Sequence, residues 1–214
     1  MRSRPLPYYR LLPRCLRAPG SLAKIGTGTL TLSGDNTYTG GTSVTGDVLK
    51  VVNTTGSATG TGLVSVDVGT LSGNGIIGGA VVLGTGTGAG AVIALSGQTD
   101  VEPGTLTING NLTFNSDSTY SYSYSAKANR ARTGLVVANG VTINTGATLD
   151  FNGTIHGRLT PGLVLTVISN TSANPVSSAF SNLPDGSTVV LAGNTFQVNY
   201  EGGDGNDLTL TVIP

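Results

Sequence analysis

The 214-residue chain contains 33 glycines, only 10% charged residues and no tryptophan. This composition is poor in helix formers and rich in β-branched and turn-forming residues. The mean hydropathy of +0.15 is too high for a chain that is intrinsically disordered because of its charge. Six of the eleven basic residues lie within residues 1–24, where there is no acid. From Ile25 onward five basic residues face all eleven acids, a net charge of −6, which argues against nucleic acid as a partner.

The first 23 residues do not resemble the rest of the chain. They are rich in Arg and Pro and lack the 7–15-residue apolar stretch of a secretory signal. We expect residues 1–23 to be a disordered basic leader; a nucleic-acid arm or an organellar transit sequence is the alternative. The single cysteine, Cys15, lies here, so the body has no internal disulfide and no Cys-based metal site. No stretch approaches the roughly 20 apolar residues of a membrane helix, which predicts no membrane-spanning segment.

From Gly26 onward, short runs with apolar residues at alternate positions are separated by Gly, Asn and Asp. This period of two predicts strands with one buried face. The runs are 28–34, 42–46, 47–52, 63–73, 76–83, 91–95, 104–110, 111–116, 134–144, 147–153, 163–169 and 187–200.

Twelve such runs without helical periodicity leave two all-β architectures, a parallel β-helix (β-solenoid) or a β-sandwich. Near-copies of one unit favour the solenoid: GTLTLSG, GTLSGNG, GTLTING and GATLDFNG. Small polar residues also dominate the turns and outward positions, as expected where coils stack in register. We therefore predict a β-solenoid and keep the β-sandwich as the alternative.

Residues 24–51, KIGTGTLTLSGDNTYTGGTSVTGDVLKV, resemble the autotransporter-associated β-strand repeat, also called the passenger-associated transport repeat. The matching elements are Gly28-Thr29-Leu30, Leu32-Ser33-Gly34, the run 36–42 and Val44. Where the family usually closes the repeat with Gly-Thr-Leu, this chain has Asp47-Val48-Leu49. Segments 71–83, 101–114 and 180–212 resemble the coils and closing module that follow such repeats.

The resemblance implies a right-handed parallel β-helix in an exported bacterial surface protein, where such a region serves as passenger or stalk. Translocation would then require a separate C-terminal barrel or a sorting signal, so we expect this chain to be the C-terminal end of a passenger. The expected organisation is a leader (1–23), solenoid repeats (24–178) and a C-terminal β cap with a hairpin (179–214). The expected location is secreted or at the cell surface, associated with the outer membrane.

The segment GGDGNDLTL (202–210) resembles the nonapeptide of calcium-binding β-rolls. Asp204, Asn206 and Asp207 carry the hard oxygen atoms that Ca²⁺ prefers. The apolar residues, however, fall at Leu208 and Leu210, and the segment occurs once. The alternative is a tight turn that joins strands 195–200 and 207–212. No other cofactor is expected.

Tyr120, Tyr122 and Tyr124 alternate in TYSYSYS, which places their rings on one face of a strand. If exposed, this strip would form a ligand face for glycans or a protein partner; if buried, it would be a packing ladder. The following AKANRART interrupts the alternation, so we expect Lys127, Arg130 and Arg132 in a solvated loop. His156 is expected to be a turn residue.

The sequence predicts a non-enzymatic structural passenger or stalk, with no catalytic residue. Parallel β-helix enzymes need carboxylates clustered on neighbouring coils, whereas here the acids are scattered, and only Asp100/Glu102 and Asp204/Asp207 are close in sequence. A polysaccharide-active enzyme is therefore the less favoured class. An adhesive module that binds a glycan or a surface protein is the main alternative, and exposed sheet edges would permit self-association.

Overall fold

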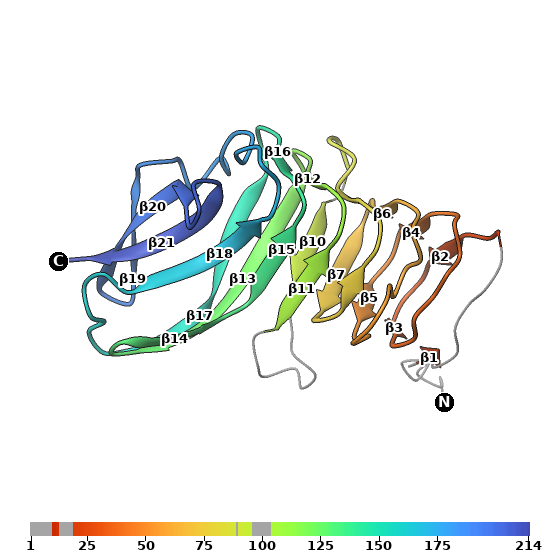
Figure 1. The fold of residues 1–214 in the computed structure, drawn as a ribbon, viewed down its shortest axis with the longest axis horizontal. Coiled ribbons are helices and arrows are strands. Elements are labelled where there is room, and N and C mark those ends of the chain that lie inside the picture. The colour runs from red at the N-terminus through yellow and green to blue at the C-terminus, as the bar shows by residue number, and fades with distance from the viewer. Residues whose placement is uncertain (1–9, 13–18, 89, 96–103) are drawn as a thin grey trace, which may run out of the picture.

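The computed structural model describes residues 10–12, 19–88, 90–95 and 104–214. All regular structure in these residues is β-strand, arranged in three sheets that run along an elongated body (Figure 1). No helix in the described part is long and apolar enough to cross a bilayer. The all-β prediction is confirmed.

Each sheet collects one strand from each successive turn of the chain. The first sheet consists of β1 (Arg10–Leu12), β3 (Thr29–Leu32), β5 (Val48–Val51), β7 (Gly69–Gly73), β10 (Ala91–Ala94), β13 (Ser118–Lys127), β14 (Arg130–Thr133) and β17 (Thr148–His156). The second consists of β2 (Leu22–Lys24), β4 (Thr42–Val44), β6 (Val64–Val66), β9 (Val81–Leu83), β12 (Leu112–Phe114) and β16 (Val141–Ile143). The third consists of β8 (Ile76–Ile77), β11 (Thr105–Ile108), β15 (Leu135–Ala138), β18 (Val164–Asn170), β19 (Thr188–Leu191), β20 (Asn194–Gly202) and β21 (Asp207–Ile213).

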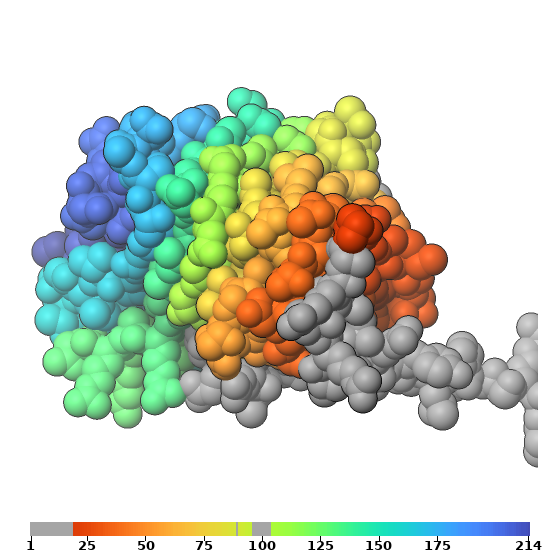
Figure 2. Space-filling view, turned by 45° about the vertical axis from the view of Figure 1, so that its right-hand side comes forward, coloured from red at the N-terminus to blue at the C-terminus, as the bar shows by residue number. Residues whose placement is uncertain are grey.

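The order of strands in one turn defines a coil. The chain passes through β6, β7 and β8 in the second, first and third sheets, and then returns to the second sheet at β9. There β9 pairs parallel with β6, with Val81 beside Val64, so this coil takes seventeen residues. The second sheet is parallel throughout, and Figure 2 shows the coils as successive bands of colour. These parallel sheets agree with the predicted solenoid and differ from the antiparallel sheets of a β-sandwich.

The core is built from inward residues that stack in register from coil to coil. Successive strands of the second sheet place one inward residue above the next, and every member of this column is at most 2% exposed. The column consists of Val44, Val66, Leu83, Phe114 and Ile143. Burying each such side chain contributes about 1.5–3 kcal/mol, which is why the alternating pattern persists along the chain.

The acids at the corners of the coils accept hydrogen bonds from the backbone of a neighbouring coil. Asp47 Oδ2 accepts from Gly28 N at 2.5 Å, and Asp35 Oδ1 accepts from Ser57 N at 3.0 Å. Asp117 accepts from Gly86 N and from Gly88 N, both at 2.8 Å. These bonds lower the pKa of Asp117, although burial acts in the opposite direction. Three of the acids that look scattered in the sequence therefore tie coils together.

The C-terminal part changes from parallel to antiparallel pairing at β18. This strand pairs parallel with β15 on one side and antiparallel with β21 on the other. β20 then pairs antiparallel with β21, and β19 with β20, so an antiparallel unit lies in the region where the cap is predicted. One apolar cluster continues from Leu32 to Val212, so no break in the core marks the boundary predicted at residue 179.

The predicted leader falls mostly outside the described residues. Of residues 1–23, Arg10–Leu12 form β1, which pairs parallel with β3, and Leu22 begins β2.

Gly60 allows two coils to approach closely. Its φ is +62°, and a Cβ there would lie 1.9 Å from the carbonyl oxygen of Tyr38 in the preceding coil. Gly60→Ala should therefore lower the free energy of unfolding by about 3 kcal/mol, from left-handed strain plus overpacking. Urea denaturation would measure this change.

The matched control is Gly26→Ala, because Gly26 has nearly the same φ, +67°, and no atom within 4 Å of the added Cβ. This variant should lose only the strain, about 1–2 kcal/mol. Equal losses in the two variants would show that the close approach of the coils does not matter.

Candidate functional site

The three tyrosines of β13 lie in the core. Tyr120 and Tyr122 are 0% exposed and Tyr124 is 8% exposed. Their rings are in continuous contact: Tyr120 and Tyr122 meet edge to face with centroids 5.9 Å apart, and Tyr122 stacks on Tyr124 at 5.7 Å. The Tyr120 hydroxyl donates to the carbonyl of Gly134 at 3.0 Å or that of Val167 at 3.2 Å, and burial raises its pKa well above the ordinary value.

A ligand could not stack on rings that are already covered by the protein. The interpretation of Tyr120, Tyr122 and Tyr124 as a ligand face is therefore corrected: the rings point inward because their alternation with serine puts the larger, more apolar side chain inside. They form the packing ladder that was the alternative interpretation.

The second candidate is the turn between β20 and β21. Asp207 Oδ1 accepts from Asn170 N at 2.8 Å, and the Asn206 amide donates to the carbonyl of Ser172 at 2.5 Å. The backbone closes tightly, since Gly205 N donates to Gly202 O at 2.9 Å. The tight turn of the alternative interpretation is therefore present.

As a calcium site this turn offers few free oxygen atoms. Asp204 is exposed, whereas one oxygen of Asp207 is already bonded to the backbone. The side-chain oxygen of Asn206 is buried without a hydrogen-bond partner. In the described part of the chain, no group of three or more His, Cys, Asp or Glu side chains is placed to hold a metal ion. The calcium hypothesis thus has one unpaired acceptor in its favour and no converging ligand set.

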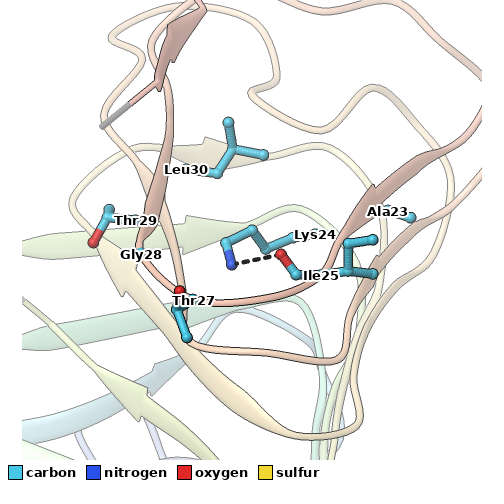
Figure 3. Close-up of a pocket in the computed structure, with 7 residues that line it drawn as sticks. All are labelled: Ala23, Lys24, Ile25, Thr27, Gly28, Thr29 and Leu30. Carbon is cyan, nitrogen blue, oxygen red and sulfur yellow. Dashed lines mark hydrogen bonds between the residues drawn. The ribbon is translucent and has the colours of Figure 1, made fainter. Parts of the chain in front are cut away.

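A hollow at the first coil is lined by residues 23–30 (Figure 3). Lys24 lies in it and is only 6% exposed. Its ammonium donates to three backbone carbonyls, those of Ile25 at 3.3 Å, Gly26 at 2.8 Å and Gly46 at 2.9 Å. Lys24 therefore joins this turn to the next coil, and its donors are occupied.

A polar hollow lies where the second and third sheets meet. Amide and hydroxyl side chains line it, including Asn111, Asn139 and Asn174. The side chain of Asn170 holds the backbone at this hollow, since it accepts a hydrogen bond from Gly140 N at 3.1 Å and donates one to Asn174 O at 2.8 Å. The hollow carries no charged side chain, so it offers hydrogen bonds without an acid or base.

The segment AKANRART forms a hairpin instead of the expected solvated loop. Lys127 ends β13, and β14 returns antiparallel beside it, with Ala128 and Asn129 as the two turn residues. Ala128 has a φ of +53°, a conformation in which Gly or Asn is usual, so the turn gave no signal in the sequence. His156, expected in a turn, is instead the last residue of β17.

Among the described residues, the acids form no cluster of three or more that could hold a metal ion. Asp35, Asp47 and Asp117 each accept backbone N–H groups, as described above, and Asp185 Oδ1 accepts from Tyr200 N at 3.0 Å. The pair Asp100/Glu102 lies outside the described residues.

The shifted pKa of Asp207 leads to a test of the turn between β20 and β21. Burial raises it, with a further rise from Asp204, while the N–H of Asn170 acts in the opposite direction. A carboxyl with a raised folded pKa costs stability when it is charged, and the cost disappears as the pH falls below the unfolded pKa of about 3.9. Asp207→Asn should therefore raise stability at pH 7 by less than about 1 kcal/mol, since the site is largely solvated. The gain should shrink towards pH 4 in urea denaturation.

Bound calcium would reverse the sign of this difference in stability. If the turn bound Ca²⁺, millimolar calcium chloride would make the unchanged chain more stable than Asp207→Asn. Asp204→Asn, in the same turn but exposed, is the control, and its effect should be smaller in calcium-free buffer.

Comparison with known proteins identifies one segment of the chain. Residues 22–46 match the family model of the passenger-associated transport repeat. No curated protein matches the chain. The matched segment comprises β2, β3, β4 and their connections, a complete coil near the N-terminal end of the solenoid. The predicted resemblance to the autotransporter-associated repeat is thus confirmed for residues 22–46.

Proposed function

We propose that this chain is a non-enzymatic structural passenger or stalk segment of an exported bacterial surface protein. The observation that supports this most is the passenger-associated transport repeat at residues 22–46, within a stack of parallel coils. Such a stack is a rod that can hold another part of the protein away from the cell. Its expected location is the cell surface or the medium.

The use of the polar and ionisable side chains agrees with a structural role. Lys24 binds backbone carbonyls, Asp117 binds backbone N–H groups, and Tyr120 is buried in the ring stack. These are residue types that an enzyme would use for chemistry. Here each of them is engaged in holding coils together.

A solenoid also suits export of an unfolded chain. Each coil contacts mainly its neighbours, so a folded coil at one end presents a strand edge on which the next coil can form. Folding outside the cell would therefore draw the chain outward step by step. The antiparallel cap at β19–β21 would provide the first folded unit.

An adhesive role is the second candidate. The polar hollow around Asn139 offers amide and hydroxyl groups of the kind that hydrogen-bond sugar hydroxyls. Binding of a neutral glycan that is lost in Asn139→Ala would favour adhesion over a purely structural role. Turnover of a polysaccharide by the purified chain would favour the enzyme class instead.

The structural role predicts that display depends on coil packing. With a signal peptide added in front and a translocator barrel behind, the chain should reach the surface of a Gram-negative host as a protease-resistant segment. Gly60→Ala should reduce this display several-fold, because a destabilised solenoid spends more time unfolded. Surface immunolabelling and protease trimming would measure the effect.

Gly26→Ala, which lacks the clash between coils, should reduce display less than Gly60→Ala does. If the chain remained inside the cell while the same signal and barrel displayed another cargo, the passenger role would be contradicted.

A further inference from the structure

The hairpin of β13 and β14, together with β17, places three basic side chains in one row. Lys127 lies opposite Arg130 across the antiparallel pair, and beside His156 across the parallel pair. The three residues therefore occupy three adjacent strands, about 4.8 Å apart. Among the described strands β14 pairs with β13 alone, and it lies in the lower part of the molecule in Figure 1.

All three side chains lie on the same exposed face. Residues directly paired across strands point to the same side of a sheet, and Lys127, Arg130 and His156 are all exposed. The opposite side packs inward, where Ala126 is buried and Ala131 contacts the apolar cluster. We call the row Lys127, Arg130 and His156 the basic face; Arg132 adjoins it, two residues further along β14.

The fold gains nothing from this arrangement of charge. Like charges directly opposite each other on neighbouring strands destabilise a sheet, and Lys127 and Arg130 are such a pair. Their side chains make no hydrogen bond or ion pair to any described residue. At the next paired position on the same face, Ser125 and Thr154 are neutral, and Arg132 lies opposite Ser125 on β14. Two cations side by side on an exposed sheet face can contact an anion outside the protein.

The chemistry of the face narrows the class of anion. Hydroxyl groups of Ser125 and Thr154 border the cations, and no large apolar side chain lies among these residues. A protein partner would require a desolvated apolar centre. An extended polymer that carries both carboxylates and hydroxyl groups fits, because Arg130 can bind a carboxylate with two parallel hydrogen bonds.

We propose that the basic face, formed by Lys127, Arg130 and His156, binds a carboxylate-bearing polysaccharide. The cations contact the carboxylates, and the neighbouring hydroxyl side chains contact the sugar hydroxyls. This goes beyond a structural role, and it would be measurable in the purified chain whether or not the protein is exported.

The test uses the full-length chain and polygalacturonate, with binding measured by affinity electrophoresis and titration at low salt. Lys127→Gln/Arg130→Gln should weaken binding about tenfold, as expected for the loss of two exposed charge contacts. Binding should also weaken as salt rises. The same polymer with its carboxyl groups methyl-esterified should not bind, because the carboxylates are what the cations recognise.

Lys50→Glu is the matched control, because it changes the net charge by the same two units on β5, three strands from β13 in the first sheet. Binding that falls as much in this control would reflect net charge alone and overturn the proposal. Stronger binding of duplex DNA or of anionic lipid vesicles than of polygalacturonate would also overturn it.

The variants should fold, since the substitutions remove like-charge repulsion. The melting temperature of Lys127→Gln/Arg130→Gln should be unchanged or higher than that of the unchanged chain. If the double variant failed to fold, Lys127→Thr, which places a residue favoured in strands at the same position, would carry the test. Undiminished binding by a folded variant would exclude the basic face as the site.

Discussion

The fold depends on each coil pairing in register with the one before, at the strand spacing of about 4.8 Å. This spacing fixes which residues meet, so one column of the first sheet runs through Leu30, Leu49, Leu71, Ile93, Tyr120 and Leu149. It also limits the space for side chains at the corners, where Gly60 lies against the carbonyl of Tyr38. The stacking of the inward residues and the need for glycine at such a corner thus both follow from the spacing between coils.

The same constraint explains where the polar side chains are used. A corner leaves backbone N–H and C=O groups without ladder partners, and buried groups of this kind must be satisfied. Asn53 Oδ1 accepts from Ile76 N at 2.8 Å, a contact between residues 23 positions apart, and Asp35 serves Ser57 in the same way. Lys24 performs the converse task for carbonyls. Asp35 and Lys24 therefore serve separate corners, so the contacts that position them keep them apart along the stack.

Much of the fold could be predicted because period-two alternation is a local signal. Three of the four near-copies were informative, since Leu30, Leu71 and Leu149 stack in one column, whereas GTLTING belongs to the third sheet. Alternation shows that Tyr120, Tyr122 and Tyr124 share a face, but it does not show which face is buried. The β13–β14 hairpin was missed because Ala128 occupies a left-handed position without Gly or Asn, and only tertiary pairing with β17 reveals its register.

The requirement that residues stack in register from coil to coil is weaker where a strand is longer than its pairing with the preceding coil. β13 has ten residues, but only Ser118–Ser121 pair with β10; the remainder pairs with β17 and β14. Side chains within the stack must pack against those of the coils on either side, so charged residues are disfavoured there. In the extension, one face still contacts the core through Ala126 and the other is exposed, and no further described strand pairs with β14. A solenoid can acquire a binding surface at such an extension without disturbing its column of buried residues, and this is where Lys127 and Arg130 lie.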